Sequence, residues 1–412
     1  MMTKIIGGIL DKMTKICKPQ KKFVAEVLST ILIGRGKLNF RNMSRYSTYS
    51  EKSFSRNYKK PFNFAEFNQH ALSLVLKMKA RLVAAFDPSY IKKSGTKTYG
   101  KDYFWNGSAN KAEKGLEIGL LSVVDVDYNT AYAISAHQTP PIAATRKHKE
   151  TPTTEESRID VYLDHIIQNK KYLPLEVHHL VCDGFFAKKK FIAGITSTGL
   201  DFVGKLRIDA NLRHSFNSFD GEKKRRGRPR KYGSKIKIDD LSQLQFVQEM
   251  ENGLKLYTAI VYNFSLQINI RIVLVINDSH KDKIGKAILF STDLNLSAVD
   301  IYHFYKARFQ IEFVFRDAKQ FTGLADCQAR SQSQLDWHFN ASFAALNIAK
   351  IEDRLTKEIE NGKNVFSMAS WKTRYFNVSL IDRFFSMLDF DLSLIKFNPK
   401  FESLRNYGTI SN

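Results

Sequence analysis

The order of strand-like and helix-like segments in the middle of the chain constrains its fold more than any other feature. RLVAAFD (81–87) is an apolar run that predicts a buried strand ending at Asp87. GLEIGLLSVVDVD (115–127) and TAYAISAHQT (130–139) predict two further strands, and the short polar turn between them indicates an antiparallel hairpin. This part of the chain therefore begins with three strands.

Two helix–strand units follow the hairpin. The first helix is predicted within 151–173, where Thr153 and Glu156 form a capping-box pattern before apolar residues at helical spacing. The remaining elements are a strand, EVHHLVCDG (176–184), a helix, KKKFIAGITSTG (188–199), and a strand, DFVGKLRI (201–208). Three strands, helix, strand, helix, strand is the order of a ribonuclease-H-like fold, in which the first and fourth strands lie side by side. Asp87 and Asp183 would then converge at adjacent strand ends.

We expect an α/β protein with a ribonuclease-H-like catalytic core, interrupted by a β-rich insertion and flanked by helical N- and C-terminal regions. The predicted parts are a helical DNA-binding region (1–80), the first part of the core (81–210), a basic loop with the β-rich insertion (211–297), a core helix region (298–350) and a helical C-terminal region (351–412). In the last region Phe384, Phe385, Met387 and Leu388 are at helical spacing. We expect them to pack on the core, with pairing to a second subunit as the alternative.

The charge of the chain predicts a polyanionic partner. Sixty-four Lys and Arg face 41 Asp and Glu, a net charge of +23, and residues 1–60 hold fourteen Lys and Arg against three Asp and Glu. Nucleic acid is the simplest partner for such a surplus. The loop GEKKRRGRPRKYGSK (221–235) predicts DNA contacts by Arg226, Arg228 and Arg230. Its Arg-Gly-Arg-Pro core resembles a minor-groove AT-hook, although a loop that touches phosphates without sequence preference is the favoured reading.

Four polar residues interrupt the apolar helix predicted at 301–320, IYHFYKARFQIEFVFRDAKQ: Tyr305, Arg308, Glu312 and Lys319. At about 100° per residue they fall in one stripe roughly 60° wide. The simplest interpretation is an Arg308–Glu312 salt bridge at the core edge. Beside two converging aspartates, however, Glu312 would complete a cluster of three acids, which is costly without a cation. Two Mg²⁺ ions, or Mn²⁺ in their place, would balance this charge and clamp a phosphodiester.

The pattern Tyr305-x2-Arg308-x3-Glu312-x6-Lys319 resembles the Tyr-Arg-Glu-Lys signature of bacterial insertion-sequence transposases of the DDE type, in the branch that cuts through a DNA hairpin. AAFDPSYIKKSGTKTYG around the first aspartate, LVCDGFFAKKK around the second and the β segment before the glutamate agree with this resemblance. It covers roughly residues 80–350.

The resemblance implies a cut-and-paste transposase in which Asp87, Asp183 and Glu312 hold two metal ions, while Tyr305, Arg308 and Lys319 contact phosphates near the cleaved end. It further implies double-stranded DNA as partner, both transposon ends and target, and a homodimer on that DNA. Relatives trap a flipped base with a tryptophan in the insertion. This chain has no tryptophan between 210 and 300, so we expect Tyr257, Tyr262 or Phe264 to stack on the base instead.

Several other residues receive weaker predictions. Lys92, Lys93 and Lys97 follow Asp87 and are candidates for DNA contact, Lys97 above all, with a solvated basic loop as the alternative. His178 and His179 point to opposite faces of their strand, so we interpret them as structural. Asp125 and Asp127 flank the hairpin turn, where we expect both to be exposed.

The cellular setting and two rival functions complete the expectations. No run of about 18 apolar residues exists, so we expect no membrane contact and a cytoplasmic location at the bacterial nucleoid. One rival is a nuclease or resolvase on the same fold that cleaves without joining strands. The other is a non-catalytic DNA-binding protein in which the acids are merely structural.

Overall fold

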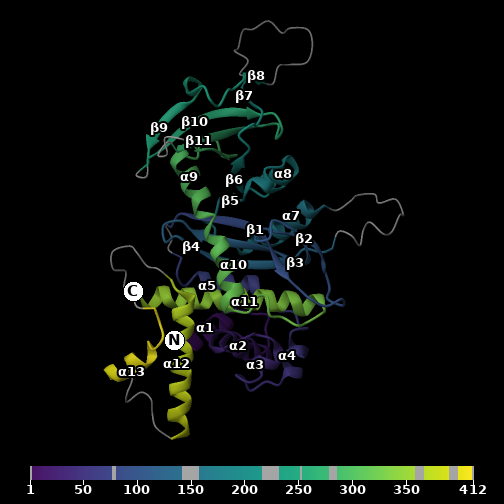
Figure 1. Cartoon of the computed structure of the whole chain (residues 1–412), viewed down its shortest axis with the longest axis vertical. Helices are drawn as coiled ribbons and strands as arrows, with labels where there is room; N and C mark the ends of the chain where they lie inside the picture. The colour runs from purple at the N-terminus through teal and green to yellow at the C-terminus, as the bar shows by residue number, and fades with distance from the viewer. Residues whose placement is uncertain are drawn as a thin grey trace, which may run out of the picture.

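The computed structural model describes residues 2–76, 80–141, 157–215, 232–250, 253–277, 285–357, 366–388 and 398–410. One mixed sheet dominates the described structure, and helices lie at both ends of the chain (Figure 1). The mixed α/β class is therefore confirmed. None of the described helices is long and apolar enough to cross a membrane.

The sheet has twelve strands in the order β2-β3-β1-β5-β6-β12-β11-β10-β7-β8, with β4 paired to β3 and β9 paired to β10. The strands are β1 (Leu82–Lys92), β2 (Asp102–Asn106), β3 (Lys111–Asp125), β4 (Thr130–Gln138), β5 (His179–Val181), β6 (Asp201–Leu206), β7 (Leu212–Ser215), β8 (Tyr232–Lys235), β9 (Gln245–Glu249), β10 (Leu254–Asn263), β11 (Ile268–Asn277) and β12 (Gly285–Ser291). Strands β7 to β12, here called the sheet extension, continue the sheet beyond β6 (Figure 1).

The predicted neighbourhood of the two aspartate-bearing strands is confirmed. Strand β1 pairs with β5 in parallel, with Ala84 opposite Leu180 and Ala85 opposite Val181. The prediction that the first strand ends at Asp87 is wrong, because β1 continues to Lys92. Its continuation pairs with the long strand β3 and so satisfies the backbone groups beyond the aspartate.

The helices between the core strands follow the prediction with shifted boundaries. They are α7 (Arg158–Asn169) between β4 and β5 and α8 (Lys189–Ser197) between β5 and β6. The predicted capping residues Thr153 and Glu156 lie outside the described residues. Ser157 and Asp160 form the capping box that begins α7.

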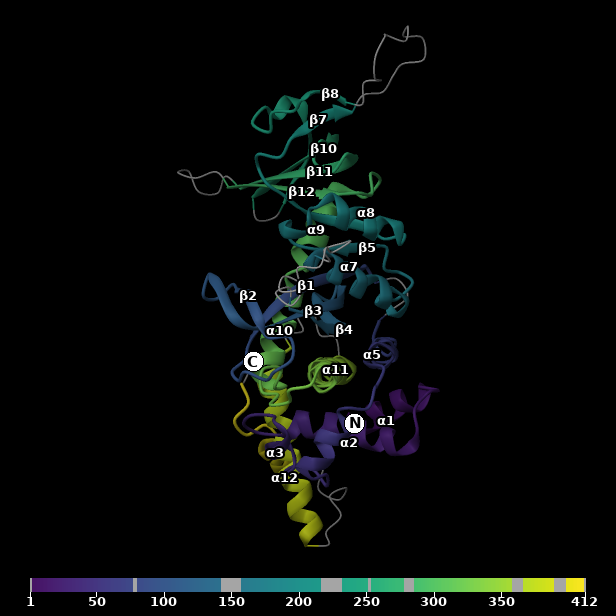
Figure 2. The same cartoon turned by 90° about the vertical axis from the view of Figure 1, so that its right-hand side faces the viewer.

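A small helical bundle precedes the sheet and packs around Trp337. Its members are α1 (Met2–Lys12), α2 (Lys18–Ile33), α3 (Phe40–Met43), α4 (Glu51–Asn57) and α5 (Phe64–Leu72). Ring centroids of Phe23, Tyr58 and Phe64 lie 5.7, 3.9 and 5.1 Å from that of Trp337. Trp337 belongs to α11 (Gln332–Thr356), which lies between the bundle and the sheet, as Figure 2 shows by viewing α11 end-on.

Helix α11 is held against strand β4 by two asparagines. The Asn347 side chain accepts from the Ala133 N–H at 3.0 Å and donates to the Ala133 carbonyl at 2.8 Å. Asn340 makes the same pair of bonds with Ala136, both at 2.9 Å. Since these bonds satisfy backbone groups of a strand that pairs with β3 alone, α11 covers an otherwise open sheet edge.

The stretch predicted as one helix at 301–320 is two helices. Helix α9 (Ala298–Ala307) ends before Arg308, and α10 (Gln310–Phe321) begins after Phe309. At the junction the N–H groups of Phe309, Ile311 and Glu312 bond to carbonyls three residues back rather than four. The chain thus tightens locally into a 3₁₀-type turn, and the polar stripe spans a break that periodicity did not predict.

Two predictions of side-chain environment are wrong. Phe384, Met387 and Leu388 at the end of α12 (Met368–Met387) are 59%, 72% and 53% exposed, so they do not pack on the core. The helix projects away from the sheet (Figure 1). Asp125, expected to be exposed, is only 1% exposed because Arg354 of α11 reaches it. Asp127 is exposed as expected and pairs with Arg81.

Candidate active site

The two aspartates come to the site from neighbouring strands. Asp87 lies within β1, and Asp183 lies two residues after the end of β5. The Asp183 side chain accepts from the Phe185 N–H at 2.9 Å and so caps the short helix Gly184–Phe186. This bond fixes the Asp183 carboxylate at the carboxyl end of its strand.

The break between α9 and α10 brings Arg308 and Glu312 to the same place. The Arg308 guanidinium donates to Glu312 at 3.1 Å and lies 5.7 Å from the Tyr305 ring centre. The Arg308 side chain is 12% exposed, whereas that of Glu312 is 40% exposed. Glu312 is therefore accessible to a ligand from solvent, and Arg308 is the more buried countercharge.

The raised pKa of Asp87 reflects its burial and the carboxylates around it. Burial is the largest effect on the Asp87 carboxyl and raises its pKa, whereas Arg308 lowers it. The negative charges of Asp183, Glu312 and Glu117 raise it further, and the resulting pKa is about 7. The three predicted acids thus lie within electrostatic reach of one another, and their mutual repulsion is only partly balanced by Arg308.

The same acids act on Arg308. Burial lowers the pKa of its guanidinium, but Asp87, Tyr305, Glu312 and Asp183 together outweigh burial and the pKa is raised. Arg308 is therefore the cation at the centre of the cluster.

The predicted acids are close but are not at metal-ligand spacing. Among the described residues, the carboxylate oxygens of Asp87, Asp183 and Glu312 do not all come within 4.8 Å of one another. The Glu312–Arg308 ion pair accounts for part of this, because it directs the glutamate toward the guanidinium. The donor set itself, three neighbouring carboxylates, suits a hard divalent cation.

Lys319 and Tyr305 border the acids. Lys319 donates to the Ser89 hydroxyl and to the Tyr90 carbonyl, both at 2.9 Å, and so ties α10 to the part of β1 that follows Asp87. Burial raises the pKa of the Tyr305 phenol, which therefore stays protonated and able to donate a hydrogen bond. Arg308, Glu312 and Lys319 thus all act on or lie beside Asp87 of β1, and Tyr305 adjoins Arg308.

Lys97 lies in a basic cleft of about 960 Å³ that is lined by residues of the N-terminal bundle and of the core. Its other cationic lining residues are Lys37, Lys92, Lys93 and Arg330. The predicted contacts Arg226, Arg228 and Arg230 lie outside the described residues. Lys37 of the N-terminal region and the lysines that follow Asp87 are far apart in the sequence, and the cleft brings them together.

Aromatic side chains gather in the sheet extension. Tyr232 stacks on Tyr262 with ring centroids 5.2 Å apart and meets Phe264 edge-on at 5.5 Å. The Arg213 guanidinium lies 4.9 Å from the Tyr232 ring and 5.6 Å from the Phe264 ring. Tyr257, the third predicted stacking residue, is elsewhere and contacts Phe246. Phe264 is 44% exposed, so one face of this aromatic cluster is open.

Sequence reasoning missed two features of the region. Glu117 on β3 is 6% exposed, acts on Asp87, and accepts a 2.5 Å hydrogen bond from the Tyr162 hydroxyl. Glu117 lies in a stretch that was predicted only as a strand, so nothing in the sequence marked it as part of the site. His179, interpreted as structural, lies 3.2 Å from Asp293. The two are 114 residues apart, so no local pattern indicated the pair.

The raised pKa of Asp87 predicts a pH-dependent stability in metal-free buffer. Because the folded-state pKa is about 7 and the ordinary value is 3.8, the folded protein holds this proton more tightly than the unfolded chain. The free energy of unfolding should therefore fall as the pH rises from about 4 to about 7. At about 1.4 kcal/mol per pKa unit, the loss is on the order of 4 kcal/mol at most.

Urea denaturation with EDTA at pH 5 and pH 8 measures this effect, and Asp87→Asn is the control because it cannot ionise. The wild type should lose more stability between the two pH values than the variant. Equal losses in both proteins would show that Asp87 is not the responsible group.

Comparison with known proteins gives one match. A protein-family model described as DDE superfamily endonuclease matches residues 42–262, more than half of the 412-residue chain. The matched range includes Asp87 and Asp183 and ends before Glu312. No curated protein matches the chain.

Proposed function

The chain belongs to the DDE superfamily of endonucleases, and from this premise we propose that it is an insertion-sequence transposase that cuts and joins DNA at transposon ends. Enzymes of this superfamily use divalent metal ions on a DNA substrate. The observation that carries the proposal is the grouping of Asp87, Asp183 and Glu312 around Arg308. Three acids with one buried cation suit metal binding better than a purely structural salt bridge.

The proposed core is ribonuclease-H-like. In support, the strand order β4-β3-β1-β5-β6 has antiparallel pairs on one side of β1 and parallel pairs on the other. The helices α7 and α8 connect the parallel strands. We propose that residues 81–210 and 298–350 form this core and that 211–297 are its insertion.

Asp87, Asp183 and Glu312 are the proposed ligands of two Mg²⁺ ions, with Mn²⁺ as a substitute. When bound, such ions supply an activated attacking oxygen and a stabilised leaving oxygen for phosphodiester cleavage. Glu312 has to exchange its Arg308 ion pair for this role, and its 40% exposure leaves room for the movement. Arg308 is then free to donate to a phosphate.

Tyr305 and Lys319 are proposed to hold the phosphates that flank the cleaved bond. The Tyr305 hydroxyl is a neutral donor, and the Lys319 ammonium is a point charge already positioned by Ser89 and Tyr90. The basic cleft with Lys97 is proposed to hold DNA farther from the cut. Arg226, Arg228 and Arg230, which lie outside the described residues, remain proposed phosphate contacts.

The aromatic cluster of Arg213, Tyr232, Tyr262 and Phe264 supports the hairpin branch. A hairpin at a DNA end strains its terminal base, and an exposed ring beside a guanidinium offers that base a stacking partner. Phe264 is the most accessible candidate because it is 44% exposed. We propose that it replaces the tryptophan that relatives carry in the insertion.

This proposal predicts that Phe264→Ala lowers hairpin yield by about tenfold or more, since stacking on one base is worth about 1–3 kcal/mol. First-strand nicking should change little because it does not require the flipped base. Denaturing gels of end-labelled DNA separate the nicked, hairpin and opened products. Phe246→Ala is the matched control, as Phe246 is 52% exposed on the same sheet but lies outside the cluster. Equal hairpin yields in the two variants would contradict the assignment.

The protein is further proposed to act as a homodimer on DNA at the bacterial nucleoid. The apolar end of α12 supports this, because Leu380, Phe384, Met387 and Leu388 are each more than half exposed. Analytical ultracentrifugation of the end-bound complex tests it, and a one-to-one complex of protein and DNA end would contradict the dimer.

The decisive assay incubates the full-length protein with duplexes that carry the element's own ends, with and without Mg²⁺ or Mn²⁺. Metal-dependent cutting followed by joining to a target supports the transposase. Cutting without joining would favour the rival nuclease. Tight binding without any cleavage on verified ends would overturn the catalytic proposal and favour a DNA-binding protein.

A further inference from the structure

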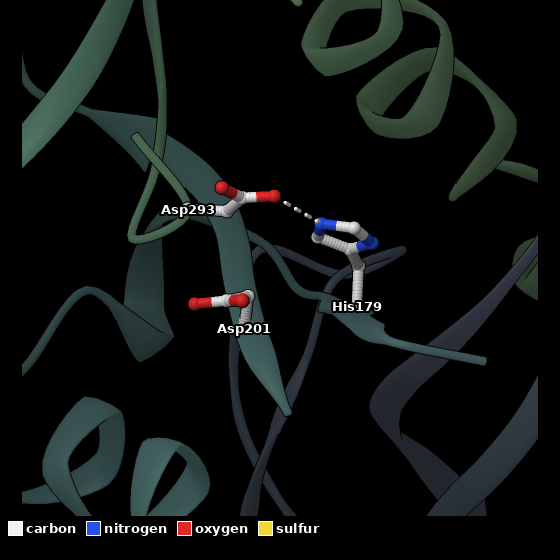
Figure 3. Close-up of side chains that lie close together, drawn as sticks. All are labelled: His179, Asp201 and Asp293. Carbon is white, nitrogen blue, oxygen red and sulfur yellow. Dashed lines mark hydrogen bonds and ion pairs between the residues drawn. The ribbon is translucent and has the colours of Figure 1, made fainter. Parts of the chain in front are cut away.

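A second group of metal-binding side chains lies away from the candidate active site. His179 begins β5, Asp201 begins β6, and Asp293 follows β12 by two residues. Among the described residues, only this group of three brings its candidate ligand atoms within 4.8 Å of one another. Figure 3 shows the Asp293 carboxylate directed at the His179 ring, with Asp201 on the neighbouring strand.

Sheet pairing brings these residues together. His179 lies directly opposite Asp201 in the parallel pair β5–β6. Strand β12 runs antiparallel to β6, so the residues that follow its end return to the start of β6. The group therefore sits at the opposite end of β5 from Asp183, and it is separate from the proposed catalytic acids.

Local hydrogen bonds orient the two carboxylates in advance. One Asp293 oxygen accepts from the Asn295 N–H at 2.8 Å, which leaves the other to face His179 at 3.2 Å. The Asp201 carboxylate accepts from the Thr292 hydroxyl at 2.8 Å, and that hydroxyl oxygen accepts from the Phe202 N–H at 2.8 Å. Such outer partners are what fix ligand geometry in known metal sites.

A His179–Asp293 ion pair alone does not explain the group. It uses one carboxylate, while Asp201 adds a second negative charge whose oxygen also lies within 4.8 Å of the other two ligand atoms. One imidazole with two carboxylates is a mixed nitrogen and oxygen donor set, which suits Zn²⁺ and similar transition-metal ions rather than Mg²⁺. We propose that His179, Asp201 and Asp293 bind a transition-metal ion of the Zn²⁺ class.

The geometry requires only small movements. Bonds of about 2.1 Å in a tetrahedral site set ligand atoms about 3.4 Å apart. His179 and Asp293 are already 3.2 Å apart, and all three ligand atoms lie within 4.8 Å of one another, so no distance has to close by more than about 1.4 Å. The side chains of His179 and Asp293 are 13% and 25% exposed. That exposure gives an ion access and leaves the fourth position to water.

The ion would fasten the sheet extension to the core. Asp293 comes from the end of the extension, Asp201 from the last core strand before it, and His179 from the strand that leads to Asp183. Binding would thus lock the position of β12 against β5 and β6. This role does not depend on the proposed transposase activity.

The test is a Co²⁺ titration of the full-length protein in excess Mg²⁺. The Asp87→Asn/Asp183→Asn/Glu312→Gln background removes the proposed catalytic ligands. We expect one equivalent of Co²⁺ to give the absorption of a four-coordinate ion with a nitrogen ligand. Asp201→Asn should weaken this binding at least about tenfold. Asparagine still accepts the Thr292 hydrogen bond, so this variant should keep its fold, which an unchanged circular dichroism spectrum would verify.

Two further measurements make the result decisive. Asp209→Asn is the matched control, because Asp209 is 69% exposed and pairs with Arg207 outside the group. It should bind Co²⁺ as the parent does. Zn²⁺ should raise the melting temperature of the background protein but not that of its Asp201→Asn derivative. No Co²⁺ binding in excess Mg²⁺, or equal binding by the Asp201→Asn and Asp209→Asn proteins, would overturn the proposal.

Discussion

The Glu312→Gln variant is expected to lose DNA cleavage and joining by more than about 100-fold while binding transposon-end DNA as the wild type does. Glutamine keeps the size of the side chain, and its amide oxygen can still accept from Arg308. It removes the negative charge that a divalent ion requires. Removing a residue that hydrogen-bonds to a metal ligand already lowers metal affinity or activity about 10–100-fold. Removing the charge of a ligand itself should lower activity more.

The measurement is the end-cleavage assay with Mg²⁺ or Mn²⁺, beside a gel-shift titration of the same DNA. Glu402→Gln is the matched control, since it makes the same substitution at a 55% exposed glutamate on helix α13 (Pro399–Arg405). It should cleave like the wild type. Cleavage by Glu312→Gln within tenfold of the wild type would remove Glu312 from the proposed triad.

The Arg354→Met variant is expected to lose about 3–5 kcal/mol of stability, because it leaves a buried carboxylate without its countercharge. Arg354 donates to Asp125 at 2.9 Å and to the Tyr132 hydroxyl at 3.3 Å, and it lies 4.0 Å from the Tyr128 ring centre. The Asp125 side chain is 1% exposed and that of Arg354 is 12% exposed. This ion pair joins α11 to the β3–β4 hairpin.

Equilibrium urea denaturation at pH 7 measures the loss. Adding Asp125→Asn to Arg354→Met should recover most of it, because the buried charge is then gone and the asparagine can still accept from the Tyr128 N–H. Arg405→Met breaks an exposed pair and should cost under about 1 kcal/mol. If Arg354→Met lost no more stability than Arg405→Met, water would be solvating the Asp125 carboxylate in place of Arg354.

The candidate site was predictable where its residues follow regular elements. Asp183 lies two residues after a strand, and the pairing of that strand with the one bearing Asp87 followed from the order of elements. Arg308 and Glu312 were predictable as a pair because residues four apart on a helix are neighbours. The break at Arg308 was not predictable, since neither proline nor glycine occurs there.

Residues that depend on distant partners escaped prediction for a common reason. Asp125 resembles an ordinary turn residue until Arg354, 229 positions later, covers it. His179 resembles a strand residue until β12 returns beside β6 and brings Asp293 to it. The aromatic side chains at the end of α12 have core-like spacing, yet the direction of the helix leaves them in solvent.

By itself, the sequence determined the order of the core strands and helices except for β2, which was not predicted, together with the strand pairing around Asp87 and the basic character that implies a nucleic-acid partner. These follow from hydrophobic periodicity, turn residues and charge, which act over a few residues or over the whole composition. Only the tertiary structure decided which charges are buried, where the long helix breaks and which carboxylates meet a histidine. The buried ion pair and the carboxylate–histidine group depend on contacts between segments 229 and 114 residues apart, which no local pattern encodes.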